Sequence, residues 1–500
     1  MKPLGTITKY YPFLDSETRD ALEALREESE NFNDFLIRLG ERVCSEDVPL
    51  HLAFMGAIWA WHGEGDGIKE RIAEKYGDFP VIVPWTFSGL ISAATKTGQE
   101  SLTDALDKAI RSQPEDWILC LTLLRKIALF IAMPEGSRAL DAAKKLLEKG
   151  PKLECFRPEI LRVEARIKDH EGDKKGAIEI YLEVLKRARQ QNDMYLVASV
   201  LRTLASKTAL TDFHKAMQFI DEAYSISEEL GLSGQLRSTL GFMSHISHKL
   251  GEYDLALKCL FNAWERIQSP RGADHHIPID VSDIHSDLED GKEALNWALM
   301  YSAEEDSDGP QKQSRHGCPE FAMARALLLM DRTDEALDHI HRLQDIAIKT
   351  GWEPWLAGHY HVSGLYEMAV GETANGMQMI EKAVEIGRRL SIQTYVNRCL
   401  IDLTKAEIEL YEIDTDDLDP RDSGPWMREL EKEASDKQLT GILIQHALLK
   451  AEFRLKLKQT EAARETLEAA LDISDQPSVK TLRGRILKQL DNLSSGVRVQ

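Results

Sequence analysis

Histidine is the residue type in this chain whose clustering could do chemistry. Eight of the fifteen histidines fall between residues 275 and 361, namely His275, His276, His285, His316, His339, His341, His359 and His361. The nearby acids Asp280 and Asp283 are of the type that completes a His/carboxylate metal site. However, His339/His341 and His359/His361 are two residues apart, and such residues point to separate faces of a helix. We therefore expect polar surface and loop histidines here and no metal site.

Other chemical signatures are missing from the sequence. It contains no phosphate-binding loop, no HExxH and no GxSxG motif. The glycine-rich GEGDG at 63–67 has no lysine and no preceding strand, so it predicts a turn between helices. The acidic run at 413–425 has Asp419 and Pro425 where an EF-hand loop starting at Asp414 would need Gly and Glu, so it predicts a solvated loop. The sequence thus predicts a non-enzymatic protein with no catalytic residue and no cofactor.

Charge and composition restrict the class of partner. The 62 Lys+Arg against 83 Asp+Glu give a net charge of −21, which disfavours nucleic acid and anionic membranes as partners. The six cysteines show no metal-binding or disulfide-framework spacing and are expected to be reduced thiols of a cytoplasmic protein. No signal-like apolar run opens the chain, and the most apolar stretch, 117–133, is interrupted by Arg125 and Lys126. We expect a protein or peptide partner, no membrane segment, and an oligomeric state that the sequence does not reveal.

The elements that must position these residues are helices. Almost every segment carries apolar residues at i, i+3, i+4 and i+7 over 12–18 residues, and Gly or Pro falls between the segments. A small residue followed by apolar residues four and seven positions later recurs along the chain. The small residues are Ala139, Ala177, Ala216, Ala256, Ala294, Ala336, Gly376 and Ala463. Their spacing from 139 to 376 is 38–42 residues, which predicts a repeat of about 40 residues made of two helices and a turn.

This pattern resembles the tetratricopeptide repeat (TPR) family. Ala177-x3-Tyr181 fits the family's A-x3-F element best, and Leu102, Leu106, Ala109 and Pro114 place the proline where the family has it. The longer period resembles the repeats of kinesin light chains and of the sensor region of maltose-regulon activators. The resemblance implies an all-α, right-handed solenoid of about ten helix hairpins. A generic helical bundle and a HEAT-type solenoid are the alternatives.

The chain divides into five parts on this pattern. We expect an N-terminal helical cap at 1–45, with a single helix from Asp15 to Val43, and an N-terminal repeat array at 46–270. An irregular acidic and His-rich segment, or a degenerate repeat, follows at 271–316. A second array then occupies 317–475, and a capping helix with a tail occupies 476–500. The irregular segment is a candidate hinge between the two arrays.

In TPR proteins the first helices of the pairs line a concave groove that holds partners, so the resemblance gives a set of candidate partner-binding residues. They are Arg162, Arg166, His170, Arg202, His245, His248 and His361. Residues 141–190 carry a local charge of +3 and residues 280–308 carry −9, an asymmetry that would orient a charged peptide. An ordinary solvated helix face is the alternative interpretation of these positions.

The function we expect is therefore a protein-protein interaction scaffold that binds a peptide or protein in the groove. The alternative is a ligand-sensing regulatory module of a signalling or transcription-control system. A metal-dependent enzyme built around the histidines at 275–361 is the third and weakest hypothesis.

Overall fold

The computed structural model confirms an all-α chain. It describes residues 5–59, 68–76, 79, 96–131, 133–209, 212–266, 277–300, 317–411 and 424–495, and within these ranges there is no strand. By their internal contacts the residues form two compact units, an N-terminal unit at Met1–Thr239 and a C-terminal unit at Leu240–Gln500. None of the described helices is long and apolar enough to cross a membrane.

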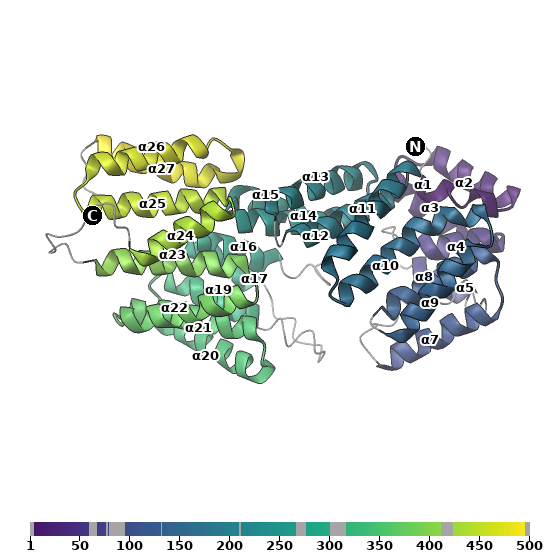
Figure 1. Ribbon diagram of the computed structural model, residues 1–500, viewed down its shortest axis with the longest axis horizontal. Helices are drawn as coiled ribbons and strands as arrows, with labels where there is room; N and C mark the ends of the chain where they lie inside the picture. Colours follow the sequence, from purple (N-terminus) through teal and green to yellow (C-terminus); the bar gives the residue numbers. More distant parts are fainter. Residues whose placement is uncertain are drawn as a thin grey trace. The chain divides into compact units, whose positions relative to one another are not determined.

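The helices of the N-terminal unit (Figure 1) are α1 Gly5–Thr8, η1 Tyr11–Phe13, α2 Ser16–Glu28, α3 Phe32–Ser45, α4 Leu50–Trp59, α5 Ile68–Tyr76, α7 Lys96–Arg111, α8 Asp116–Leu129, α9 Pro134–Leu147, η3 Pro151–Phe156, α10 Arg157–His170, α11 Lys174–Gln190, α12 Met194–Thr208 and α13 Phe213–Glu229. Helix α14, Ser233–Leu250, begins in this unit and ends in the next.

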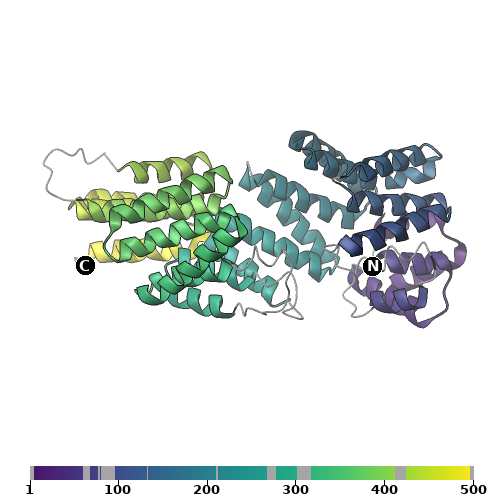
Figure 2. The ribbon, with the colours of Figure 1, turned by 90° about the horizontal axis from the view of Figure 1, so that it is seen from below.

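The C-terminal unit contains α15 Tyr253–Trp264, α16 Ile277–Asp287, α17 Gly291–Met300, α19 Gly317–Leu328, α20 Thr333–Thr350, α21 Glu353–Ala369, α22 Thr373–Arg389, α23 Gln393–Leu410, α24 Pro425–Asp436, α25 Thr440–Lys456, α26 Thr460–Ile473, η5 Pro477–Val479 and α27 Lys480–Ser494. Neighbouring pairs stack on one another within this unit, as α19 to α23 do in both ribbon views (Figures 1 and 2).

The predicted repeat register is confirmed by burial. Every small residue of the series is buried, and most have no exposed surface at all. The turn glycines Gly172, Gly251 and Gly371 have φ between +75° and +94°, the left-handed region that lets a helix end and the chain reverse. At Gly364 an added Cβ would lie 2.6 Å from the carbonyl oxygen of Gly376, so α21 and α22 approach as closely as two backbones can.

This seam makes a mutational prediction. Ala177→Leu in α11 and Ala256→Leu in α15 should each lower the free energy of unfolding by about 1–3 kcal/mol, because both side chains are fully buried and overpacking a core contact costs that much. Urea denaturation measures the effect. Ala469→Leu, on an exposed position of α26, is the matched control and should leave the midpoint nearly unchanged. Unchanged midpoints in both seam variants would show that the register is wrong.

Two sequence-based expectations need correction or refinement. The single helix predicted from Asp15 to Val43 is wrong, because α2 ends at Glu28 and α3 starts at Phe32 with the Asn31 side chain accepting from the Asp34 amide. Within 271–316, α16 and α17 pair as a hairpin, which is the degenerate-repeat alternative. Residues 301–316, the GEGDG turn and most of the acidic run 413–425 lie outside the described residues. The five-part division otherwise stays a prediction.

The residues before α2 pack back onto the first helices of the N-terminal unit. The Gly5 amide donates to the carbonyl of Asn192, and a Cβ on Gly5 would lie 1.7 Å from the Gln191 carbonyl oxygen. Tyr10 packs against Trp117 and Phe156 with ring centroids 6.2 and 5.7 Å apart. This segment, residues 5–14, therefore closes one side of the site described next.

Candidate binding site

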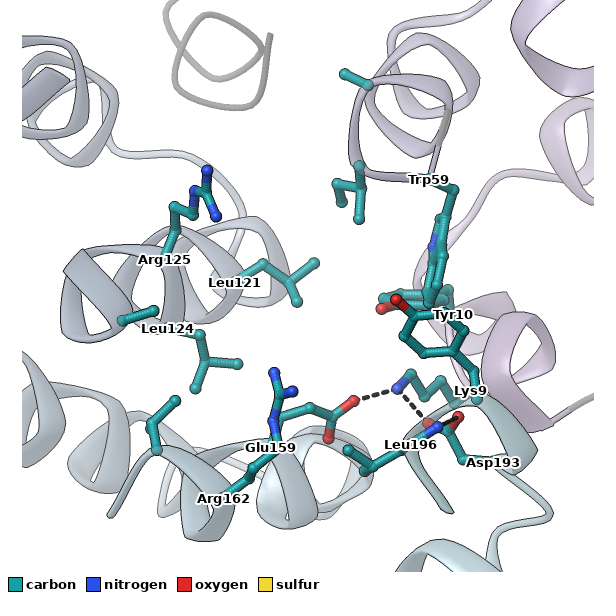
Figure 3. Close-up of a pocket in the computed structure, with 15 residues that line it drawn as sticks. Lys9, Tyr10, Trp59, Leu121, Leu124, Arg125, Glu159, Arg162, Asp193 and Leu196 are labelled. Carbon is teal, nitrogen blue, oxygen red and sulfur yellow. Dashed lines mark hydrogen bonds and ion pairs between the residues drawn. The ribbon is translucent and has the colours of Figure 1, made fainter. Parts of the chain in front are cut away.

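A cavity of about 220 Å³ lies in the N-terminal unit where the 5–14 segment meets α4, α8, α10 and α12 (Figure 3). All the lining residues that belong to repeat pairs come from the first helices α8, α10 and α12, or from the residue that precedes α12, and none comes from the second helices α9, α11 and α13. The walls are mainly apolar, with Leu121 and Leu124 of α8 and Trp59 of α4 among them. Arg125 and Arg162 add positive charge to this mainly apolar lining.

The floor of the cavity holds a buried ionic cluster. Lys9 forms ion pairs with Glu159 and, at 2.7 Å, with Asp193, and the hydroxyl of Thr6 donates to Asp193 at 2.7 Å. Burial alone would raise the pKa of Asp193, but the Lys9 charge and the hydrogen bonds hold it below its ordinary value. One carboxylate oxygen of Glu159, Oε2, is buried and has no hydrogen-bond partner.

Three arginines on adjacent first helices form what we call the basic face: Arg162 and Arg166 of α10 and Arg202 of α12. In the part of the chain that the structure describes, none of the three has an ion pair or hydrogen bond to an acidic side chain. Partial burial and the charge of Arg162 lower the pKa of Arg166. Both Arg162 and Arg202 act on the half-buried Tyr195, where burial raises the phenol pKa and the two positive charges partly offset that rise.

The sequence interpretation missed two related arginines. Arg125 in α8 and Arg237 in α14 extend the series Arg125, Arg162, Arg202, Arg237, with successive separations of 37, 40 and 35 residues. The first helices α8, α10, α12 and α14 thus each carry an arginine of this series, about one repeat apart. Burial lowers the pKa of both Arg125 and Arg202. The repeat period was the signal that could have found them.

The predicted candidate residues do not form one group. Arg162, Arg166, His170 and Arg202 lie in the N-terminal unit, whereas His245, His248 and His361 lie in the C-terminal unit. His170 is exposed in the last turn of α10, and His245 is exposed on α14 beside the Phe242 ring. The structure brings together the three arginines, and their role in binding stays a prediction.

The other two histidines take part in internal contacts. His248 Nε2 lies 2.7 Å from Asp287, and its side chain is only 11% exposed. His361 has no exposed surface, and its Nε2 donates to Asp402 at 2.8 Å while its ring packs against Phe321. Burial lowers the pKa of His361, and the contact with Asp402 partly offsets that effect. In this structure His361 therefore does not reach a surface where a partner could touch it.

Asp287 is the centre of a buried charged network in the C-terminal unit. It accepts from His248, from Arg325 Nη2 at 2.9 Å and from Arg398 Nε at 2.7 Å, and all three partners come from different helices. Burial would raise the pKa of Asp287, but the two guanidinium charges and the His248 hydrogen bond hold it well below its ordinary value. Burial would lower the pKa of Arg398, but the carboxylates of Asp283 and Asp287 raise it.

The histidine-rich region gives no metal centre in the described residues, where no group of three His, Cys, Asp or Glu side chains is arranged to hold an ion. His339 pairs with Glu320 at 2.6 Å, and His359 contacts the hydroxyl of Ser363 at 3.2 Å. His275, His276 and His316 lie outside the described residues.

Comparisons with known proteins give structural likenesses only. No family model and no curated protein matches the chain. A Rap protein complexed with competence and sporulation factor aligns at 12% identity and TM-score 0.33, over 76% of this chain and 97% of its own. A signal-transduction ATPase with a tetratricopeptide repeat sensor from Pyrococcus horikoshii aligns at 14% identity and TM-score 0.35. The alignment covers 98% of this chain and 66% of that protein. A chain of the APC/C Cut9–Hcn1 hetero-tetramer aligns at 13% identity and TM-score 0.37. The alignment covers 95% of this chain and 94% of that one.

At these identities and TM-scores the likenesses say nothing about function. The repeat class is instead evident in the chain's own helices, which come in pairs with a seam of small residues and a left-handed residue at the turn, glycine in several pairs. By this architecture the protein is an all-α repeat protein of paired helices, and its fold resembles that of tetratricopeptide repeats.

Proposed function

We propose that the chain is a non-enzymatic binding protein that holds an acidic, extended segment of a partner protein on its basic face, Arg162, Arg166 and Arg202. The observation that carries this proposal is the absence of acidic partners for these three side chains within the described structure. The chain has 83 acidic residues against 62 basic ones, so most cations could find a carboxylate. Because these three neighbouring arginines have no carboxylate partner in the described residues, they are available to bind an anionic group of another molecule.

Position on the repeat supports the same function. Arg162 and Arg166 are four residues apart and so share one side of α10, and Arg202 occupies the next first helix. Neighbouring helices pack about 8–10 Å apart, so charges on successive first helices suit an extended peptide with acids spaced along it. Such complementary charge gives a partner its orientation and speeds its association.

The test uses labelled twelve-residue peptides of graded net charge, titrated at several salt concentrations. Arg162→Glu with Arg166→Glu should weaken binding of the acidic peptides by about 2–5 kcal/mol and make the remaining affinity less sensitive to salt. The matched control reverses two exposed charges of α11, Lys174→Glu with Lys186→Glu, and should keep the affinity. Lost binding with an unchanged melting temperature supports the basic face, whereas unchanged binding removes these arginines from the site.

A ligand-sensing module is the second candidate function. The cavity beside the basic face favours it, because a mainly apolar pocket with a few convergent polar groups is the usual form of a small-molecule site.

A further inference from the structure

The cavity of the N-terminal unit holds two polar atoms whose hydrogen-bonding capacity is unused. Glu159 turns one carboxylate oxygen to Lys9 and leaves the buried Oε2 without a partner. Arg162 has a buried Nε that also lacks one. Both side chains line the cavity and lie next to each other in Figure 3, but the ion pair that Glu159 forms there is with Lys9 and not with Arg162.

A buried acceptor and a buried donor without hydrogen-bond partners lower the stability of the fold unless a bound molecule forms hydrogen bonds with them. Leaving one buried polar group unsatisfied costs about 1–3 kcal/mol, and more if the group is charged. Glu159 and Arg162 are three residues apart on α10, which puts their side chains on the same face, about 5–6 Å apart at Cβ. A ligand that satisfies both must therefore carry a cationic donor and an anionic acceptor close together.

The size and walls of the cavity describe the rest of the ligand. An apolar cavity of about 150 Å³ can hold benzene with its six carbon atoms, so about 220 Å³ leaves room for roughly nine non-hydrogen atoms. Leu121, Leu124 and Leu196 would face an apolar group on that ligand. Arg125, which also lines the cavity, adds a second positive charge for the anionic end.

We propose that this cavity is a binding site for a free α-amino acid with an apolar side chain of the size of leucine or methionine. The ammonium group donates to Glu159 Oε2, the carboxylate accepts from the guanidinium groups of Arg162 and Arg125, and the side chain lies against Leu121 and Leu124. This site shares Arg162 with the basic face, but Arg166 and Arg202 do not line the cavity, so amino-acid binding and peptide binding can be tested apart at Arg202.

The test is calorimetric titration of the full chain with L-leucine and L-methionine, with melting temperature as a second readout. Saturable binding with one site per chain and a rise in melting temperature are expected. N-acetyl-L-leucine and L-leucinamide, which each lack one charge, should bind roughly 10- to 100-fold more weakly, the loss expected when a hydrogen bond to a charged group is removed. These two compounds probe the unaltered protein, so a folding defect cannot imitate the result.

Variants then locate the site. Leu124→Trp fills the cavity without changing any charge and should abolish binding, and Arg162→Met should weaken it roughly 10- to 100-fold. Arg202→Met, one repeat away and outside the cavity, is the matched control and should bind leucine as the unaltered protein does. Absence of saturable binding of either amino acid, equal binding of N-acetyl-L-leucine, or unchanged binding by Leu124→Trp would each overturn the proposal. None of these outcomes bears on the acidic-peptide titration, which Arg202→Met should weaken.

Discussion

Asp287→Ala is expected to lower the free energy of unfolding of the C-terminal unit by about 3–5 kcal/mol, the cost of removing one partner from a buried ionic cluster. The Asp287 side chain is 6% exposed, and Arg325 and Arg398 beside it are 6% and 5% exposed. Without the Asp287 carboxylate, the guanidinium groups of Arg325 and Arg398 remain buried but lose the negative charge that compensates for their removal from water. Urea denaturation monitored by circular dichroism measures the loss.

Two comparisons make the Asp287 result specific. Asp338→Ala removes the same charge from an exposed position of α20 and should change stability by no more than about 0.5 kcal/mol. The pH dependence gives the second comparison. Because folding lowers the pKa of Asp287, its stabilisation is complete above the unfolded pKa of about 3.9 and is lost as the pH falls below it. The stability gap between unaltered protein and Asp287→Ala should therefore narrow below about pH 4; a gap independent of pH would contradict the ionic account.

Lys9→Met should destabilise the N-terminal unit by a similar amount, about 3–5 kcal/mol, because it leaves Glu159 and Asp193 buried without their shared cation. The Lys9 side chain is 6% exposed and that of Asp193 is fully buried. Methionine keeps the length and apolar stem of lysine, so the lost charge dominates the effect. Denaturant midpoints and tryptophan fluorescence report it, since Tyr10 beside Lys9 packs against Trp59 and Trp117.

A charge-balanced variant tests the cause. Lys9→Met combined with Glu159→Gln and Asp193→Asn removes the two stranded charges and should recover part of the lost stability, since a whole buried ionic group can often be replaced at little cost. Lys186→Met, at an exposed site of α11, is the control for the substitution itself. If the triple variant is no more stable than Lys9→Met, the loss comes from packing of the 5–14 segment and not from charge.

Much of the fold could be predicted because it depends on the spacing of small residues and turn glycines along the sequence. A small residue such as Ala177 or Ala256 every 40 residues fixes which side of each second helix is buried, and the turn glycines mark where the pairs reverse. The break between α2 and α3 was missed because it consists only of Ser29 to Asn31, with no Gly or Pro. Caps of this kind stop a helix through side-chain hydrogen bonds and leave little trace in the hydrophobic pattern.

The site could be predicted only in part. Arg162, Arg166 and Arg202 follow from the repeat register, which places them on first helices. Pairings over long sequence distances do not follow from any local pattern, as with Lys9 and Asp193, or Asp287 and Arg398. Arg325 does leave a signal, because a single arginine inside the apolar run FAMARALLLM has to be paired. Its partner, however, comes from another repeat.

The docking of residues 5–14 has a consequence for the order of folding. Thr6 and Lys9 contact Asp193, which lies 187 and 184 positions later in the chain. At a synthesis rate of about 5–20 residues per second, roughly 10–40 s separate the synthesis of these residues from that of Asp193. The aromatic contacts of Tyr10 with Phe156 and of Phe13 with Trp117 also join residues far apart in the sequence, but Trp117 and Phe156 are made before Asp193. The contacts of residues 5–14 with Asp193 therefore cannot form until α12 begins to be made, long after residues 5–14 themselves.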